Sequence, residues 1–324
     1  MDDLPLRDLV GYGRHGPQAD WPGGARLAVS FVLNYEEGGE RSVADGDPHA
    51  EIYLTPEIVG LAPVARRNLS VEDLFEYGSR AGFWRLLKIF AERRAPFTSW
   101  AVGLALARNP DAGIAMAEAG HEVASHSWRW IDYADMPEDR EREDIRRTVE
   151  TIRKITGSPP LGWYTGRYSR NTRRLVMEET ETLYDSDCYN DDLPYWTLVA
   201  GKPRLLVPYA LDTNDFKFAM NPGWTSGEDF LTYLKAAFDR LYQEGESAPK
   251  MMSIGLHCRL SGRPGRAETV ARFIDYVLRH ERVWICRRVE IARHWMDRHP
   301  ASASDQAGGT HMDKAASRGC EPDA

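Results

Sequence analysis

Residues 26–39 read Arg-Leu-Ala-Val-Ser-Phe-Val-Leu-Asn-Tyr-Glu-Glu-Gly-Gly, a mostly apolar run that ends in two acidic residues and two glycines. Such a run predicts a β-strand covered on both faces in a parallel sheet. Glu36 and Glu37 then lie at its carboxyl end, where folds of this class hold their chemistry. Two carboxylates close together repel each other, so one tends to have a raised pKa. The pair is a candidate general base, and its alternative interpretation is a solvated loop.

Helix-like and strand-like segments alternate from about residue 79 onward. This order is typical of βα units around a parallel sheet, and seven or eight such steps favour one α/β barrel over two domains. The predicted helices are 79–94, 111–119, 139–156, 171–179, 228–244, 266–280 and a last one to about 299. The predicted strands are 97–102, 121–126, 161–164, 183–185, 204–207, 250–257 and 283–286.

Three segments fit no βα unit. Residues 1–25 and 38–78 are rich in Gly, Pro and Asp, which predicts an N-terminal arm and an insertion that forms a lid or a subunit contact. Residues 300–324 are rich in Ala, Ser, Gly and charge and predict a disordered tail. We therefore expect a single barrel domain over 1–299.

Composition excludes several classes of protein. The 49 acidic and 41 basic residues give a formal charge of −8 with no basic stripe, so nucleic acid is not an expected partner. No apolar run reaches the ~18 residues that span a bilayer, and the first residues lack the pattern of a signal peptide. We expect a cytoplasmic protein without a membrane partner. The four cysteines are dispersed and predict free thiols.

Polar and aromatic side chains fall at the carboxyl ends of several predicted strands. They are Glu36, Glu37, His126, Trp163, Tyr164, residues 212–215 and His257. Parallel strands of one barrel bring such residues together, which predicts an active site. One of the two glutamates would take a proton from water, and His257 would protonate a leaving nitrogen. His126, the Tyr164 hydroxyl or backbone N–H groups would hold the developing oxyanion.

A bound metal ion would need its ligands among the same residues. The position four residues after His126, where a second imidazole would complete a site, holds Trp130. Indole has no lone pair to offer, and a catalytic zinc needs three protein ligands. We expect no bound metal and no cofactor. The aromatic residues near the strand tips favour a small flat substrate or are ordinary packing. Arg259 begins a run with three arginines in eight residues, which either binds a substrate oxygen or forms a solvated helix entry.

These residues resemble the motifs of the polysaccharide deacetylase superfamily. Residues 34–38 are similar to Thr-Phe-Asp-Asp-Gly, which implies that Glu36 is the base and Glu37 stands at a metal-ligand position. Residues 126–130 resemble His-Ser/Thr-x-x-His with the final ligand missing. Leu256-His257 resembles the Leu-x-His motif of the general acid in looser register, and residues 212–216 resemble the Asp-rich motif.

Within that superfamily, residues 5–298 are similar to the metal-independent allantoinases. The segments that carry the resemblance are 34–40, 77–82, 128–130, 162–167, 211–215 and 255–259. The resemblance implies a distorted (β/α) barrel, a homo-oligomer that is a tetramer, and opening of the hydantoin ring of allantoin to allantoate. One departure is Ser127, where the family usually has Gly. We expect Glu36, Glu37, His126 and His257 to be catalytic. We expect substrate contacts from Trp130, Trp163, Tyr164, Asp215 and Arg259.

Three other functions stay open at this point. A related cyclic imide or hydantoin hydrolase would use the same groups on another planar ring. A metal-dependent polysaccharide or chitooligosaccharide deacetylase would need a metal site in spite of Trp130. A catalytically inactive barrel that binds a sugar or metabolite would leave Glu36 and His257 without a role.

Overall fold

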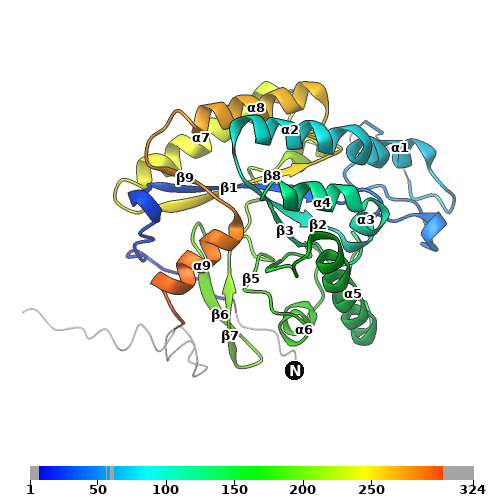
Figure 1. Ribbon diagram of the computed structural model, residues 1–324, viewed down its shortest axis with the longest axis horizontal. Coiled ribbons are helices and arrows are strands. Elements are labelled where there is room, and N and C mark those ends of the chain that lie inside the picture. Colours follow the sequence, from blue (N-terminus) through cyan, green and yellow to red (C-terminus); the bar gives the residue numbers. More distant parts are fainter. Residues whose placement is uncertain (1–6, 56, 59–61, 302–324) are drawn as a thin grey trace, which may run out of the picture.

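The computed structural model describes residues 7–55, 57–58 and 62–301, which form one curled sheet with helices packed outside it (Figure 1). The strand order is β6-β7-β5-β4-β3-β2-β1-β8, with β9 beside the start of β1. Neighbouring strands are parallel except for β6 and β7. The predicted distorted (β/α) barrel is confirmed. The strands are β1 Leu27–Tyr35, β2 Phe97–Ala101, β3 Glu122–Ser125, β4 Gly162–Trp163, β5 Tyr184–Asp185, β6 Tyr195–Val199, β7 Lys202–Leu206, β8 Lys250–His257 and β9 Val283–Ile285.

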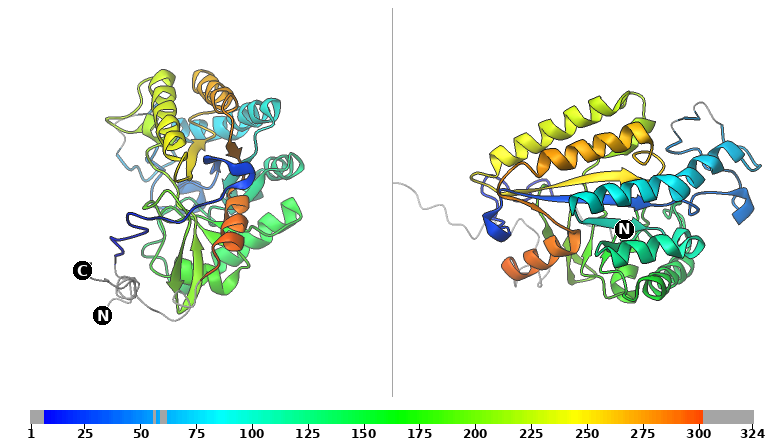
Figure 2. Two further views of the ribbon diagram at one scale, coloured as in Figure 1. Left: turned by 90° about the vertical axis from the view of Figure 1, so that its left-hand side faces the viewer. Right: turned by 45° about the horizontal axis from the view of Figure 1, so that its top comes forward.

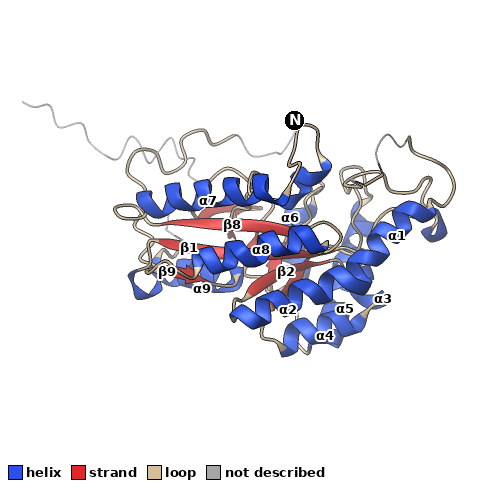
Figure 3. Ribbon diagram, turned by 90° about the horizontal axis from the view of Figure 1, so that it is seen from above, coloured by secondary structure: helices blue, strands red, loops and turns tan. Residues whose placement is uncertain are grey.

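Most of the helices cover the outer face of the sheet, whereas α9 packs in the core that contains Ala28 and Val32. Helices α7 and α8 lie side by side along β8 and β1, with α2 next to α8 (Figures 2 and 3). Helices α3, α4 and α5 continue this layer over β2 and β3. None of the helices in the described ranges is long and apolar enough to cross a membrane. The helices are α1 Leu69–Tyr77, α2 Phe83–Arg93, α3 Gly103–Arg108, α4 Pro110–Glu118, α5 Glu138–Thr156, α6 Thr172–Glu179, α7 Gly227–Glu244, α8 Pro264–Val277 and α9 Arg288–Arg298.

Strand β1 separates two apolar cores because its side chains alternate between the faces of the sheet. Odd-numbered residues such as Phe31 and Leu33 pack in the large core under the outer helices. Ala28 and Val32 pack in a second core on the inner face. The same alternation places Met252 and Ile254 of β8 in the outer core and Met251 in the inner one. This alternation decides which polar residues at the strand ends face the interior.

The predicted insertion over 38–78 contains a helix that the sequence analysis did not identify. Helix α1 begins after Asn68, whose side chain accepts a hydrogen bond from the Val71 N–H. It runs through one π-helical turn, η3 Gly78–Gly82, directly into α2. The prediction that the helix starts at residue 79 was therefore wrong. The apolar residues Val71, Leu74 and Phe75 have helical spacing, and this was the signal for α1.

Three further segments differ from or refine the predicted pattern. Strand β6 was not predicted, and it forms an antiparallel hairpin with β7 through Ala200 and Gly201, which both have positive φ. Helix α3 was also missed. In the N-terminal arm, Trp21 is buried and its indole N–H donates to the Lys250 carbonyl at 2.8 Å. The tail predicted for residues 300–324 lies almost wholly outside the described residues.

Candidate active site

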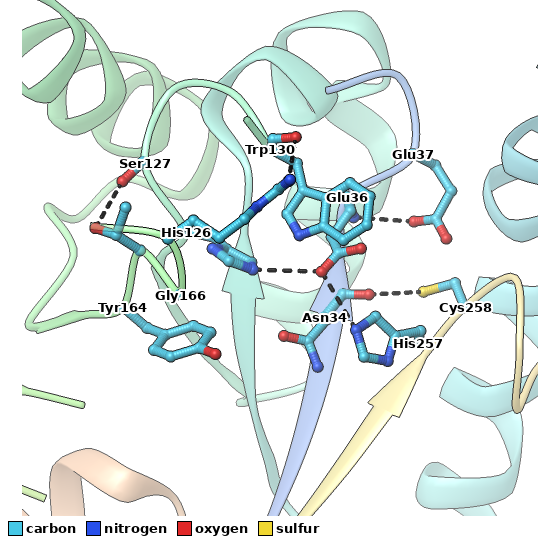
Figure 4. A network of polar contacts seen from close by, with 12 residues as sticks. Asn34, Glu36, Glu37, His126, Ser127, Trp130, Tyr164, Gly166, His257 and Cys258 are labelled. Carbon is cyan, nitrogen blue, oxygen red and sulfur yellow. Dashed lines mark hydrogen bonds and ion pairs between the residues drawn. The ribbon is translucent and has the colours of Figure 1, made fainter. Parts of the chain in front are cut away.

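The carboxyl ends of β1, β3 and β8 bring Glu36, His126 and His257 into one cluster (Figure 4). Glu36 Oε1 lies 3.3 Å from Nε2 of His126 and 3.3 Å from Nε2 of His257. The three residues are 0%, 2% and 5% exposed. Strand alternation accounts for this, because each of the three continues the inner-face register of its strand. One carboxylate oxygen thus faces two imidazoles in a site that excludes most water.

The Glu36 carboxylate stays ionised although it is buried. Burial alone would raise its pKa, but the positive charges of His257 and Arg259 hold that pKa well below its ordinary value. The Arg259 guanidinium donates from Nη1 to Glu36 Oε2 at 2.7 Å. Oε2 of Glu36 is therefore hydrogen-bonded, while Oε1 lies within ion-pair distance of both imidazoles and has no hydrogen-bond partner among the described residues.

His257 is the charged imidazole of the cluster. Its Nδ1–H donates to Asp215 Oδ1 at 2.6 Å, and Asp215 Oδ2 accepts from the backbone N–H groups of His257 and Ser261. Burial would lower the pKa of His257, but the carboxylates of Glu36 and Asp215 raise it to about 9. At neutral pH His257 therefore holds a proton on Nε2, which lies 3.3 Å from Glu36 Oε1.

His126 is the neutral imidazole of the cluster. Burial lowers its pKa, and this effect exceeds the raising effect of Glu36. Its ring lies 4.9 Å from the ring of Tyr164. Because Nε2 faces a carboxylate oxygen, the single proton of this imidazole lies on Nε2, and Nδ1 is left as an acceptor.

Glu37 faces away from the two histidines (Figure 4). Its carboxylate accepts from the backbone N–H groups of Glu36 at 3.0 Å and Arg259 at 3.1 Å. Burial raises its pKa to about 7, in spite of the lowering effect of Arg259. It packs against η3, where a Cβ on Gly78 would lie 2.3 Å from Glu37 Oε1. Glu37 thus packs the turn after β1 against η3, and only glycine at 78 permits this close approach.

Three of the expected substrate contacts border the cluster, and two do not. Tyr164 packs on His126, while Trp130 and Arg259 lie against each other next to Glu36. The structure does not bring Trp163 to the cluster, because it points to the opposite face of β4 and packs with Ile145, Leu175 and Val176. Asp215 is fully buried and uses both oxygens on His257 and Ser261, so it positions the acid instead of touching substrate.

The insertion supplies site residues that the sequence analysis missed. Phe75 of α1 packs against the Arg259 guanidinium, with 4.4 Å between the guanidinium carbon and the ring centre. Tyr53 is half exposed and stacks on Trp130 with ring centres 5.8 Å apart. Arg167 lies over both of these rings. The signal for Phe75 was the helical spacing of α1, whereas nothing in the local sequence singled out Tyr53.

Ser127 has a backbone conformation that explains the glycine usual at its position. Its φ is 60°, in the left-handed region that glycine adopts without strain. Two hydrogen bonds hold the serine there: its N–H donates to Ser125 Oγ at 3.1 Å, and its hydroxyl pairs with the Thr165 hydroxyl at 3.0 Å. These two hydrogen bonds accommodate a serine in the left-handed conformation beside His126.

Comparison with known proteins places the chain in a family. The family model for polysaccharide deacetylases matches residues 68–184. A protein of Schizosaccharomyces pombe, provisionally described as a polysaccharide deacetylase, is 47% identical over 318 residues, which cover 92% of this chain and 99% of the relative. The chain belongs to the polysaccharide deacetylase family. As a member of this family it is a hydrolase.

Two solved structures of this polysaccharide deacetylase fold are similar over nearly the whole chain. A crystal structure from Pseudomonas aeruginosa PAO1, provisionally described as a polysaccharide deacetylase, is 54% identical, has a TM-score of 0.88, and matches 91% of this chain and 99% of its own. The crystal structure of PuuE allantoinase is also 54% identical, has a TM-score of 0.89, and matches 93% and 100% of the two chains. The relatives thus carry two different functional names.

In this chain, the residues at the metal-binding motif of polysaccharide deacetylases do not form a set of metal ligands. Glu37 accepts hydrogen bonds from backbone N–H groups, and residue 130 is a tryptophan. Of the three motif positions, only His126 therefore keeps an atom that is free to coordinate a metal. In the part of the chain that the structure describes, no group of three or more His, Cys, Asp or Glu side chains is arranged to hold a metal ion. The guanidinium of Arg259 adds a positive charge beside Glu36, where it would repel a cation. The residues present therefore do not fit a metal.

Proposed function

We propose that the protein hydrolyses a small cyclic amide, allantoin first, to the ring-opened carboxylate. The observation that carries the proposal is the Glu36 carboxylate held between a charged and a neutral imidazole at 3.3 Å each, beside a guanidinium at 2.7 Å. This arrangement supplies a base and an acid at one point without a metal ligand set. The 54% identity to a structure named as an allantoinase supports the choice of substrate.

Glu36 and His257 divide the acid and base work. Glu36 accepts a proton from water as the water oxygen bonds to the ring carbonyl carbon. The carbon–nitrogen bond then breaks while His257 gives its Nε2 proton to the leaving ring nitrogen. The pKa of Glu36 is lowered and that of His257 is raised. At neutral pH Glu36 is therefore ionised and can accept a proton, while His257 is protonated and can donate one.

The contact between the two groups also closes the cycle. After ring opening Glu36 carries the water proton and His257 is neutral. Glu36 Oε1 lies 3.3 Å from His257 Nε2, so the proton passes directly back to the imidazole. The new carboxylic acid loses its own proton to solvent, and the site regains its starting charges.

The substrate assay separates the candidate functions. Purified protein is given allantoin, hydantoin, succinimide and an N-acetylated chitooligosaccharide in parallel, and products are measured. We expect allantoin to be opened fastest. Faster succinimide or hydantoin turnover would assign the related imide or hydantoin activity. Release of acetate from the oligosaccharide alone would assign the deacetylase function that the names of the S. pombe and P. aeruginosa relatives suggest.

The pH dependence distinguishes Glu36 from Glu37 as the base. With Glu36 as base, kcat/KM for allantoin should stay level through pH 7. It should fall on the acid side only well below the ordinary pKa of a glutamate, and on the basic side as His257 loses its proton at about pH 9. With Glu37 as base, kcat/KM would fall on the acid side below about pH 7, where that carboxylate becomes protonated. We expect the first profile, and an acid limb near pH 7 that disappears in Glu37→Gln would contradict it.

The Glu37→Gln variant should be less stable without being inactive. Glutamine offers one carbonyl oxygen where Glu37 accepts two backbone N–H groups, so one N–H loses its acceptor, at a cost of about 1–3 kcal/mol. We expect a lower midpoint of thermal unfolding and a kcat within about tenfold of wild type. Loss of turnover in a variant that unfolds like wild type would make Glu37 part of the chemistry.

Location and assembly remain predictions of the proposal. A cytoplasmic enzyme of ureide breakdown is expected, and its assembly is expected to be a homotetramer. Gel filtration with light scattering measures the assembly directly.

A further inference from the structure

Arg259 is buried in a sandwich of aromatic rings beside the base. Its side chain is 1% exposed, and the guanidinium carbon lies 4.4 Å from the ring centre of Phe75 and 4.9 Å from that of Trp130. Its Nε–H donates to the Leu54 carbonyl at 3.4 Å, and Nη1 donates to Glu36. Four groups from separate segments thus fix the plane of the guanidinium, which is a costly arrangement for a buried charge unless the charge is used.

The Nη2 group at the edge of this guanidinium is unused. Nη2 is buried and has no hydrogen-bond partner among the described residues. A buried charged donor without an acceptor is strongly unfavourable, so it points to an acceptor on a ligand. Nη1 and Nη2 share one carbon atom and Nη1 lies 2.7 Å from Glu36 Oε2. An acceptor bound to Nη2 therefore lies next to the carboxylate that activates water.

We propose that Arg259 Nη2 binds the carbonyl oxygen of the substrate and stabilises the oxyanion that forms on it. The inference rests on the proposed function and adds to it a positively charged donor for the carbonyl oxygen. Water attack turns the neutral carbonyl into a tetrahedral oxyanion, and a fixed positive donor in a site that excludes water stabilises that change. The oxygen then becomes part of the product carboxylate, a group that guanidinium also binds well.

The other candidate donors are less suited to the oxyanion. His126 is neutral, and its free Nδ1 is an acceptor because the proton lies on the Nε2 that faces Glu36. The Tyr164 hydroxyl pairs with the Tyr189 hydroxyl at 3.0 Å, and burial raises the pKa of Tyr164 well above its ordinary value. Neither offers a positive charge.

Trp130 acquires a role through this inference. In the family motif the position holds a metal ligand, and a bound metal would supply positive charge by coordination. Here the indole at 130 lies against a guanidinium, and Tyr53 and Arg167 hold the indole from its outer side. Trp130 cannot bind a metal ion, but it orients the Arg259 guanidinium, which supplies the positive charge that a metal would have supplied.

The test compares three variants of Arg259 with a matched arginine. Arg259→Met and Arg259→Ala remove the donor, Arg259→Lys keeps a charge without the planar fork, and Arg263→Met removes a nearby arginine that stacks on Tyr77. We expect kcat for allantoin to fall about 10²–10³-fold in Arg259→Met with a smaller change in KM. The kcat of Arg259→Lys should lie between those of Arg259→Met and wild type, and the kcat of Arg263→Met should match that of wild type.

Rescue and pH separate an oxyanion role from a structural one. Added guanidinium chloride at low millimolar concentration should restore part of kcat in Arg259→Ala and none in Glu36→Gln. The acid limb of Arg259→Lys should match that of wild type, and that of Arg259→Met should move to higher pH, because Arg259 lowers the pKa of Glu36. A kcat within threefold of wild type in Arg259→Met would overturn the inference, as would a loss confined to KM.

The outcome for the inference stays separate from that for the proposed function. If wild type opens no ring amide, the proposed function fails. The inference is then judged by calorimetric binding of hydantoate, a ring-opened carboxylate, to wild type and to Arg259→Lys. Tighter binding to wild type by tenfold or more supports Arg259 as the acceptor site, and equal or absent binding overturns it.

Discussion

Glu36→Gln is expected to lower kcat for allantoin by about 10³-fold, the size typical of a lost general base. The amide of glutamine cannot take a proton from water, although it fills the same space between His126 and His257. The loss should lie in kcat and not in KM, because the carboxylate acts on water. The variant also removes the largest raising influence on the pKa of His257, so that imidazole should titrate at lower pH.

A second buried carboxyl provides the control for Glu36. Glu122 lies at the amino end of β3 and accepts hydrogen bonds from Thr98, Tyr184 and the Val289 N–H. Glu122→Gln should lower the midpoint of thermal unfolding and leave kcat unchanged. Equal kcat in Glu36→Gln and wild type, with both proteins folded, would remove Glu36 from the mechanism.

His257→Asn should lower kcat by about 10²–10³-fold, because the leaving nitrogen then has no proton donor. Asparagine keeps a polar group near the position of Nδ1 but has no transferable proton at the position of Nε2. The matched control is His280→Asn, which changes a histidine that bonds to the Tyr276 carbonyl at the end of α8, remote from the strand tips. That control should turn over allantoin at the wild-type rate, and an equal loss in both variants would point to stability instead of catalysis.

Asp215→Asn tests the same acid through its pKa. The Asp215 carboxylate raises the pKa of His257, so its removal should move the basic limb of kcat/KM from about pH 9 toward lower pH. A raised histidine pKa also stabilises the fold. That stabilisation is fully present below the ordinary pKa of 6.5 and is lost as pH rises through about 9. Wild type should lose stability over this window more steeply than Asp215→Asn.

Strand alternation explains most of what the sequence could predict about the site. Glu36 continues the register of Ala28 and Val32, so it faces the inner core, and Glu37 must face the helices. The same rule places Tyr164 inside and Trp163 outside. Trp163 was expected to touch substrate because the residues at the strand ends were grouped together without assigning each one to a face of the sheet.

The remaining site residues depend on contacts between distant segments. Phe75 reaches Arg259 because α1 and α2 join through a π-helical turn, and Gly82 allows that turn to approach the Cys258 carbonyl, where a Cβ would lie 2.1 Å away. Tyr53 meets Trp130 across 77 residues of sequence, and no local pattern encodes such a stack. The bond between Arg259 and Glu36 likewise joins the ends of β8 and β1. The residues of each pair become neighbours only when the sheet has folded.

The central claim is that a carboxylate, an imidazolium and a guanidinium open a cyclic amide without a metal ion. The most direct measurement is allantoin turnover by protein that has been dialysed against a strong chelator and checked for metal content by mass spectrometry. We predict the same kcat before dialysis, after dialysis and after zinc is added back. Loss of turnover on dialysis that zinc restores would contradict the account.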